Sequence, residues 1–233
     1  MKAKNIAIIL AAGKSRRWGG NVPKQFDIID GRKMYACSVE TFNKHPQIDE
    51  VVIVVPDGYQ DEVSRENNWC KVTKIVSGGD ERFNSSMNVL QALGNEKDDT
   101  IVLFHDAARP YVSSEIIDRV LEMMKNYNAV TAAIPATDTI AQMNDDKNNI
   151  KDIPDRQFIL QVQTPQGFKI STIREAYNSA KKDGNFTATD DCGVVLKYLN
   201  HEKIGIAQGD EKNFKYTFGV PNKLSDNLDV SAR

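Results

Sequence analysis

The segment ILAAGKSRRWGGNVPKQF, residues 9–26, gathers positive charge and glycine in one short stretch. Glycine at positions 13, 19 and 20 lets backbone N–H groups come close to a bound anion. Full positive charges stand among these glycines, at Lys14, Arg16, Arg17 and Lys24. Because the segment follows an apolar run, it predicts a loop that holds a polyphosphate. A solvated basic loop with a tight turn is the alternative.

Two other phosphate-binding motifs do not match this segment. Gly13, Lys14 and Ser15 resemble the end of a Walker A motif, but that motif needs a glycine five positions earlier, where Ile8 stands. The GxGxxG fingerprint of dinucleotide-binding folds is also missing. These differences argue against a P-loop and against a dehydrogenase.

A second segment, GGDERFNSS at residues 78–86, lies between an expected strand and an expected helix. Asn84, Ser85 or Ser86 can cap this helix. The N-terminus of the helix would then face the edge of the sheet where ligands bind, and a helix N-terminus attracts anions. A capping loop without a ligand is the alternative.

A third segment, FHDAARP at residues 104–110, follows a buried apolar strand. Asp106 stands where an α/β enzyme holds a metal ion, with His105 and Arg109 on either side. A carboxylate is a hard oxygen ligand for Mg²⁺, which usually keeps several waters and takes phosphate oxygens as partners. The segment therefore predicts Asp106 as a magnesium ligand, with a simple turn cap as the alternative.

Weaker candidates lie further along the chain. Arg156 carries a guanidinium suited to bidentate phosphate contact, although a surface ion pair with Asp155 explains the DR dipeptide as well. The segment TATDD, residues 187–191, opens an expected helix that Thr189 or Asp190 can cap. Lys215 follows the last expected strand.

The elements that must position these residues alternate along the chain. Apolar runs predict strands, and apolar residues at helical spacing predict helices, one of them capped by Ser113 or Ser114. This rhythm favours an α/β fold with a mostly parallel sheet and helices on both faces, with ligands at the carboxyl ends of the strands. Strands are expected at 6–10, 51–55, 101–104, 129–134, 158–161 and 204–207, and helices at 34–42, 84–93, 113–124, 170–182 and 190–199.

The polar stretch from 135 to 155 interrupts that rhythm. The sequence NDDKNN forms an expected turn between 139–143 and 150–153, which predicts a β-hairpin too polar for the core. We expect it to project as an arm over about 136–157, with Thr139 and Arg156 at its two feet, and a surface loop is the alternative.

Composition limits the classes of protein. The 233 residues suggest one domain over 1–233, and a formal charge of −2 gives no bulk attraction to nucleic acid or membrane. No stretch reaches the roughly 20 apolar residues that span a bilayer. The three cysteines lack the spacing of a metal site or a redox pair, which favours reduced thiols and a cytoplasmic protein.

Taken together and in order, the motifs resemble one family. They are LAAGKSRR, PKQF, GGDERFNS, HDAARP, DTI, DR, QTPQGF, TDD and NFK. Over about residues 4–215, the chain resembles the 2-C-methyl-D-erythritol 4-phosphate cytidylyltransferases of isoprenoid synthesis and the closely related ribitol-5-phosphate cytidylyltransferases. The resemblance implies a Rossmann-like nucleotidyltransferase domain whose β-arm clasps a second subunit of a homodimer.

The resemblance also implies a reaction and a set of roles. A phosphate oxygen of a polyol phosphate would attack the α-phosphorus of CTP, and pyrophosphate would leave. The implied catalytic residues are Arg17, Lys24 and Lys215, and Asp106 would hold Mg²⁺. The implied nucleotide-binding residues are Ala11, Ala12, Gly13, Lys14, Gly79, Asp80, Ser85 and Ala107. The acceptor would be bound by Arg109 and Thr189, together with Thr139 and Arg156 of the neighbouring arm.

The chain departs from the family pattern at three places. Ala141 stands where the methylerythritol enzymes often have lysine, and NFK replaces the usual NIK around Lys215. The tail, about 216–233, lacks the usual final apolar helix. Transfer to methylerythritol phosphate is the main hypothesis, transfer to ribitol phosphate is the alternative, and a non-catalytic nucleotide-binding protein is a further one.

Overall fold

The computed structural model describes residues 3–13, 23–66, 68–183, 186 and 190–217, and its centre is a seven-stranded sheet. The strand order is β11-β7-β10-β6-β1-β4-β5. Neighbouring strands pair in parallel except along β10, which is antiparallel to both β6 and β7. The strands are β1 Asn5–Leu10, β4 Glu50–Val55, β5 Val72–Ser77, β6 Ile101–Asp106, β7 Ala129–Pro135, β10 Leu160–Lys169 and β11 Ile204–Gln208. The prediction of a mostly parallel sheet is confirmed.

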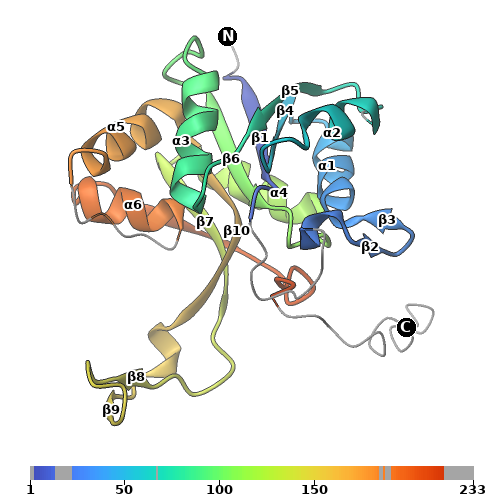
Figure 1. Ribbon diagram of the computed structural model, residues 1–233. Coiled ribbons are helices and arrows are strands. Elements are labelled where there is room, and N and C mark those ends of the chain that lie inside the picture. The colour runs from blue at the N-terminus through green and yellow to red at the C-terminus, as the bar shows by residue number, and fades with distance from the viewer. Residues whose placement is uncertain (1–2, 14–22, 67, 184–185, 187–189, 218–233) are drawn as a thin grey trace.

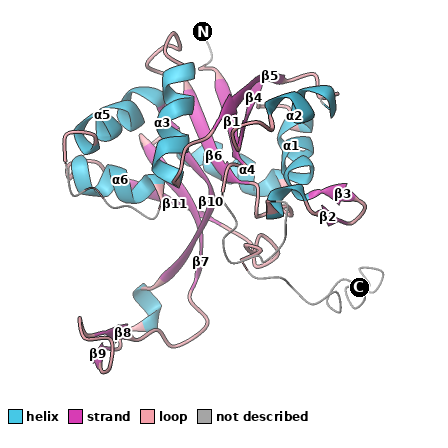
Figure 2. Cartoon of the chain, in the orientation of Figure 1, coloured by secondary structure: helices cyan, strands magenta, loops and turns pink. Residues whose placement is uncertain are grey.

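Helices cover both faces of this sheet (Figures 1 and 2). One face is covered by α1, Met34–Lys44, α2, Gln60–Glu66, and α4, Ser114–Met123. The other is covered by α3, Arg82–Ala92, α5, Ile170–Ala180, and α6, Asp191–Tyr198. Because successive side chains of a strand point to opposite faces, Ile9 of β1 packs in the first layer and Ile8 in the second.

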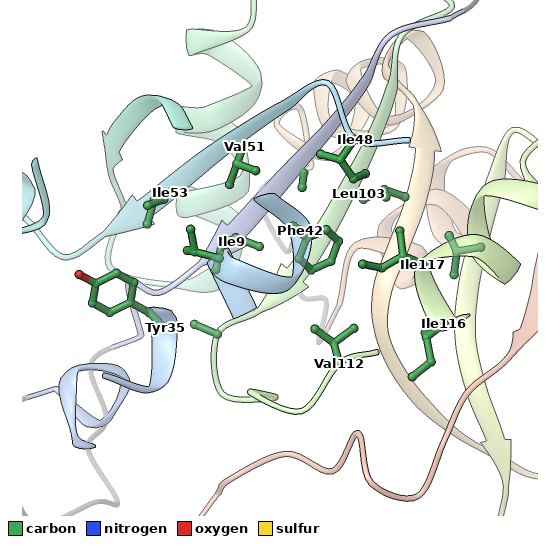
Figure 3. Packing of buried hydrophobic residues seen from close by; sticks show 14 of the residues in the cluster. Ile9, Tyr35, Phe42, Ile48, Val51, Ile53, Leu103, Val112, Ile116 and Ile117 are labelled. Carbon is green, nitrogen blue, oxygen red and sulfur yellow. The ribbon is translucent and has the colours of Figure 1, made fainter. Parts of the chain in front are cut away.

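The first layer shows how one helix stripe closes a core (Figure 3). Phe42 of α1 is fully buried and lies over Ile9 of β1 and towards Ile117 of α4. Tyr35 and Val39 occupy the same stripe at helical spacing, as expected. Continuous apolar runs in β1 and β4 are what a strand buried on both faces requires. The core thus fixes the carboxyl ends of β1 and β6, where the candidate residues stand.

The arm predicted from the polar stretch is present. Strand β8, Gln142–Met143, pairs antiparallel with β9, Ile150–Asp152, and the 3-10 turn Arg156–Phe158 follows. Figure 1 shows this hairpin at the end of β7 and β10, away from the helices. Ala136 continues the pairing beyond β7 by donating its N–H to the carbonyl of Ile159 (2.9 Å).

Some elements differ from those expected. Of the short strand expected at 158–161, only Leu160 and Gln161 lie in a strand, and Phe158 ends the preceding 3-10 turn. The strand that they begin, β10, continues to Lys169 across an irregularity in its pairing between Val162 and Gln166. Proline and glycine inside a strand normally indicate a break. Because β10 contains Pro165 and Gly167, its full length was not predicted from the sequence. Helix α3 begins at Arg82, before the expected caps, because Glu81 and Asn84 form a capping box.

A short helix and a small hairpin were not expected at all. Helix α2 is short, and strands β2, Ile28–Ile29, and β3, Arg32–Lys33, form a hairpin. Asp30 and Gly31 between them have φ values of 48° and 74°, the left-handed conformation that a two-residue hairpin turn requires. Across the part of the chain that the structure describes, no helix is long and apolar enough to cross a membrane.

Candidate active site

A cavity of about 260 Å³ opens at the carboxyl ends of β1 and β6. The N-terminus of α3 and the 3-10 turn Lys24–Phe26 form its sides. It is lined by Leu10, Ala12, Gly13, Lys24, Gln25, Gly79, Asp80, Glu81, Arg82, Ser85, Asp106, Ala108 and Lys215. This is the edge of the sheet at which a mostly parallel α/β fold binds ligands.

The cavity brings together most of the predicted nucleotide-binding and catalytic residues. Those that line it are Ala12, Gly13, Lys24, Gly79, Asp80, Ser85, Asp106 and Lys215. Ala11 and Ala107 are buried and do not line it. Thr139 and Arg156 lie on the exposed arm. Lys14, Arg17 and Thr189 fall outside the described residues.

A larger hollow of about 520 Å³ lies between the β2–β3 hairpin and α1. Its charged side chains pair among themselves: Lys33 binds Glu66 at 2.5 Å, and Glu40 binds both Arg32 and Lys44. Since these pairs leave no convergent charge for a ligand, we place the candidate site in the smaller cavity.

Asp106 is held between two cations at the end of β6. Its Oδ1 pairs with Arg82, and its Oδ2 lies 2.7 Å from Nζ of Lys215. Burial alone would raise the pKa of Asp106, but the charges of Arg82 and Lys215 hold it well below its usual range. The carboxylate therefore stays ionised at neutral pH.

Arg82 is the residue that the sequence motifs did not reveal. Its guanidinium bridges Asp106 of β6 and Asp191, which is fully buried at the start of α6. Asp191 also accepts hydrogen bonds from Ser86 (2.8 Å) and Tyr177 (2.5 Å). The bridge thus joins α3, α5 and α6 to the end of β6. The motifs GGDERFNS and TDD contain both partners, and only their contact in space shows the link.

Burial would lower the pKa of Arg82, but the carboxylates of Asp106 and Asp191 raise it. Arg82 therefore keeps its charge beside the cavity. A fixed guanidinium here offers positive charge to a phosphate or neutralises Asp106 in its absence.

The other lysine, Lys24, lines the same cavity. It begins the 3-10 turn Lys24–Phe26, and its Nζ donates to the carbonyl of Tyr216 at 2.7 Å. Gln25 ties this turn to β1 by donating from Nε2 to the carbonyls of Ala11 and Gly13, the latter at 2.9 Å. These hydrogen bonds therefore fix the turn to the chain that follows β1.

Two glycines at the end of β5 let the chain pass close to the cavity. A Cβ on Gly78 would lie 2.1 Å from Cβ of Ala12, and one on Gly79 would lie 2.2 Å from Cβ of Asn84. No side chain fits in either space. The N–H of Gly79 donates to Oγ of Ser85 at 3.1 Å, so the two residues predicted to bind the base are already in contact.

Arg109 and His105 support the loop behind Asp106. Arg109 donates to the carbonyls of Asn213 (2.8 Å) and Val162 (3.1 Å), and burial lowers its pKa. Nε2 of His105 lies 3.0 Å from the carbonyl of Arg109, which can only accept, so Nε2 carries the proton. Nδ1 then accepts from the hydroxyl of Thr164 (3.0 Å), which in turn accepts from the N–H of Asp106 (3.1 Å). Burial lowers the pKa of His105 to about 4, so the ring is neutral at neutral pH.

The donor set fits a metal ion that is held largely by the substrate. Within the described ranges, no group of three or more His, Cys, Asp or Glu side chains could hold a metal alone. Asp106 offers an ionised carboxylate at the cavity wall. Magnesium commonly uses one or two carboxylates and fills its other positions with phosphate oxygens and water.

The fold and the cavity define an α/β nucleotide-binding protein whose site places lysine and arginine around Asp106. Comparison with known proteins gives the family. The family model IspD, described as 2-C-methyl-D-erythritol 4-phosphate cytidylyltransferase, matches residues 5–224. The chain belongs to this family. The predictions of the family, of its fold and of the cytidylyltransferase class of enzyme are confirmed.

Similar proteins fall into two groups by their names. A bifunctional ribulose 5-phosphate reductase/CDP-ribitol pyrophosphorylase, Bcs1, of Haemophilus influenzae is 40% identical over 97% of this chain and 48% of its own length. The chain thus spans about half of that relative. A 2-C-methyl-D-erythritol 4-phosphate cytidylyltransferase of Thermobifida fusca is 40% identical over 91% of this chain and 87% of its own.

Solved structures agree with the fold. A 4-diphosphocytidyl-2C-methyl-D-erythritol synthase of Anaerococcus prevotii superimposes with a TM-score of 0.79 at 26% identity, over 92% of this chain and 93% of the other. A 2-C-methyl-D-erythritol 4-phosphate cytidylyltransferase of Francisella tularensis also gives 0.79, at 25% identity, over 96% and 97%.

Proposed function

We propose that the chain transfers CMP from CTP to a polyol phosphate and releases pyrophosphate, with 2-C-methyl-D-erythritol 4-phosphate as the preferred acceptor. The observation that carries this proposal is the convergence of Lys24, Lys215 and Arg82 on the cavity around Asp106. Membership of the family supports the choice of CTP and of this acceptor.

The proposed reaction is a direct displacement at phosphorus. An oxygen of the acceptor's phosphate forms a bond to the α-phosphorus of CTP as the bond to the bridging oxygen of the β-phosphate breaks. The bridging oxygen leaves with pyrophosphate, on the side of the phosphorus opposite the attacking oxygen. No covalent intermediate with the protein is needed. The protein contributes position and charge, and these two contributions supply most of the catalysis in such reactions.

Most of the predicted residues have a role in this scheme. Lys24 and Lys215 would stabilise the charge on the α-phosphate from two sides, with Arg17 of the loop beyond the described residues. Gly79 and Ser85 would bind the cytosine edge, next to Ala12 and Gly13. Arg109 and Thr189 would bind the acceptor, for which Arg109 would exchange its present carbonyl partners.

Magnesium is the proposed metal ion, held by Asp106 together with phosphate oxygens and water. When bound, it would supply positive charge to the triphosphate oxygens. Asp106 contributes the ionised carboxylate, and Arg82 and Lys215 keep it oriented at the cavity wall.

The arm supports a homodimer. Its exposed apolar side chains are Ile140, Met143, Ile150, Ile153 and Phe158, each between 43% and 79% exposed. A second copy that covered these side chains would bring Thr139 and Arg156 to its partner's site, which makes the site composite.

The free, widely spaced cysteines support a cytoplasmic location.

Ribitol 5-phosphate is the second candidate acceptor. The Haemophilus relative named for CDP-ribitol aligns with 97% of this chain, against 91% for the Thermobifida relative at the same identity. Ala141 on the arm also leaves out a positive charge that methylerythritol enzymes often carry at this place.

The deciding experiment measures pyrophosphate release from CTP and Mg²⁺, with methylerythritol 4-phosphate and ribitol 5-phosphate as parallel acceptors. We expect release with the first. Release with ribitol 5-phosphate alone would identify ribitol 5-phosphate as the acceptor and contradict the proposed one. Tight CTP binding without release in either arm would indicate a different acceptor or a non-catalytic nucleotide binder.

A further inference from the structure

An aromatic cluster, made of Tyr111, Phe214 and Tyr216, surrounds the segment that carries Lys215. Ring centroids lie 5.0 Å apart for Phe214 and Tyr216, 5.8 Å for Tyr111 and Phe214, and 6.2 Å for Tyr111 and Tyr216. These distances suit favourable aromatic pairs. Phe214 is 41% exposed, so the cluster lies outside the core and its rings are not explained by core packing.

A chain of hydroxyl groups fixes this cluster to the β2–β3 hairpin. Tyr111 donates to Oδ2 of Asp30 at 2.9 Å, and its oxygen lies 3.3 Å from that of Tyr216. Because a carboxylate only accepts, the proton of Tyr111 goes to Asp30, and Tyr216 must donate to Tyr111. Burial, with the hydrogen bonds to Tyr216 and Asp30, raises the pKa of Tyr111 well above its usual range, so the hydroxyl keeps its proton.

The backbone of Tyr216 connects both lysines of the site. Its N–H donates to the carbonyl of Ala108 (2.9 Å), and its own carbonyl accepts from Nζ of Lys24 (2.7 Å). The preceding residue is Lys215, whose Nζ reaches Asp106 (2.7 Å). A shift of Tyr216 would therefore move the partner of Lys24 and the backbone of Lys215 together.

The other end of this segment is anchored independently. Asn213 is fully buried and donates to the carbonyl of Thr164 (2.8 Å) and to Oε1 of Gln163 (3.2 Å). Loss of the aromatic cluster would therefore release the segment at Tyr216 while Asn213 holds it in place. The expected effect of this loss is a small displacement of Lys24 and Lys215, without unfolding of the protein.

We propose that Tyr111 is a positioning residue that holds Lys24 and Lys215 at a fixed separation, on two sides of the reacting phosphate. The proposal rests on the function proposed above. A displacement of about 1 Å at a reacting centre costs on the order of 10²-fold in rate. A partial loss of the aromatic cluster should cost less, about 10-fold.

The first test compares Tyr111→Phe with Tyr198→Phe. Tyr198 is the matched control: its hydroxyl also donates to a carboxylate, that of Asp183 at 2.6 Å, but it lies on α6 away from the cavity. We expect Tyr111→Phe to lower kcat about 10-fold and to change KM for CTP less than 2-fold, with Tyr198→Phe unchanged. An unchanged kcat in Tyr111→Phe would overturn the proposal, as would equal losses in both variants.

The second test asks whether Tyr111 acts through Lys24. In a Lys24→Ala background the partner of the Tyr216 carbonyl is gone and only the effect through Lys215 remains. Tyr111→Phe should then lower kcat clearly less than it does in the wild-type protein, since residues that act as a unit are not additive. Independent, multiplicative losses would contradict the proposal.

A third measurement does not depend on activity. Hydrogen exchange of the Tyr216 amide, which bonds to Ala108, should accelerate about 10-fold in Tyr111→Phe and stay unchanged in Tyr198→Phe. If the wild-type protein transfers CMP to neither acceptor, the proposed function fails, and this exchange rate alone decides whether Tyr111 holds the segment. Unchanged exchange would sink the positioning role in either case.

Discussion

At the scale of the residue, the centre of the site is Asp106, whose carboxylate lies between cations that come from distant parts of the chain. Asp106 meets Lys215 and Arg82, and Arg82 continues to Asp191. Asp106 was predicted from its position, because a carboxylate after a buried strand lies where ligands bind, and Lys215 was predicted through the family resemblance. The motifs did not reveal Arg82, because its contacts with Asp106 and Asp191 span long intervals of sequence that no local pattern encodes.

Replacement of Lys24 by alanine tests the charge that this site provides. A preorganised positive charge at a reacting phosphate is worth roughly 10²-fold or more in turnover, so Lys24→Ala should lose at least that in kcat. The measurement is pyrophosphate release at saturating CTP. Lys44→Ala is a suitable control, because this lysine lies on α1 and pairs with Glu40 at the surface. Full activity in Lys24→Ala would remove Lys24 from the mechanism.

Replacement of Asp191 by asparagine tests the buried bridge. The replacement removes one of the two carboxylates that neutralise the charge of Arg82. Breaking a buried ion pair in this way costs about 3–5 kcal/mol. We expect the free energy of unfolding in urea to fall by about that amount.

The control for Asp191 is Asp183→Asn. Asp183 is partly exposed and pairs with Lys197 at 3.3 Å, and exposed pairs contribute about 1 kcal/mol or less. Asp183 also accepts the hydroxyl of Tyr198, and the amide oxygen of asparagine can still accept it. If the two variants lost the same free energy, the bridge would not stabilise the fold.

At the scale of the element, β10 and the arm are the parts that would carry the acceptor side of the proposed site. The polar turn NDDKNN was enough to predict the hairpin, because its turn chemistry is local. The length of β10 was not predictable, since its pairing with β6 and β7 overrides the local effect of Pro165 and Gly167. Likewise the cap of α3 was misplaced, because serine and asparagine are the stronger caps in general and Glu81 acts here through its reciprocal bond with Asn84.

Arg156 tests whether the arm binds the acceptor. Its guanidinium donates to the carbonyl of Thr137 at 2.8 Å, and the residue is exposed. In a composite site, Arg156→Ala should raise KM for the polyol phosphate about 10-fold or more and leave CTP affinity within about 2-fold, as expected for the loss of a charge-assisted phosphate contact. Lys151→Ala, on β9 of the same arm, is the control. Equal effects on acceptor and CTP would exclude a composite site.

At the scale of the whole molecule, two helical layers hold the sheet, and buried histidines make that packing sensitive to acid. His105 is fully buried and burial lowers its pKa to about 4, while burial also lowers the pKa of His45. An unfolded histidine titrates near 6.5, so the unfolded chain binds protons first as the pH falls. Stability is therefore fully present above about pH 6.5 and is lost progressively towards pH 4.

The expected loss from His105 is about 3 kcal/mol, from a pKa difference of roughly 2–3 units. Urea unfolding at pH 7 and pH 4.5 measures most of it. The variant His105→Gln, whose amide can still donate to the carbonyl of Arg109, should show a smaller difference between the two pH values. His201→Gln, at an exposed position, should behave as the wild type. Identical pH dependence in all three proteins would assign the acid sensitivity to other groups.

Strand β10 also has a consequence for the history and engineering of this chain. It runs from the arm into the middle of the sheet, where Thr164 touches the backbone of Asp106 and Gln166 reaches the start of α6. The arm therefore continues directly from a central strand of the sheet and is not an insertion in a surface loop. A deletion at the base of the arm would change the register of the strand that supports Asp106. Minimal versions of this enzyme should be sought by shortening the tip at β8 and β9, and lineages of such proteins should vary in length there first.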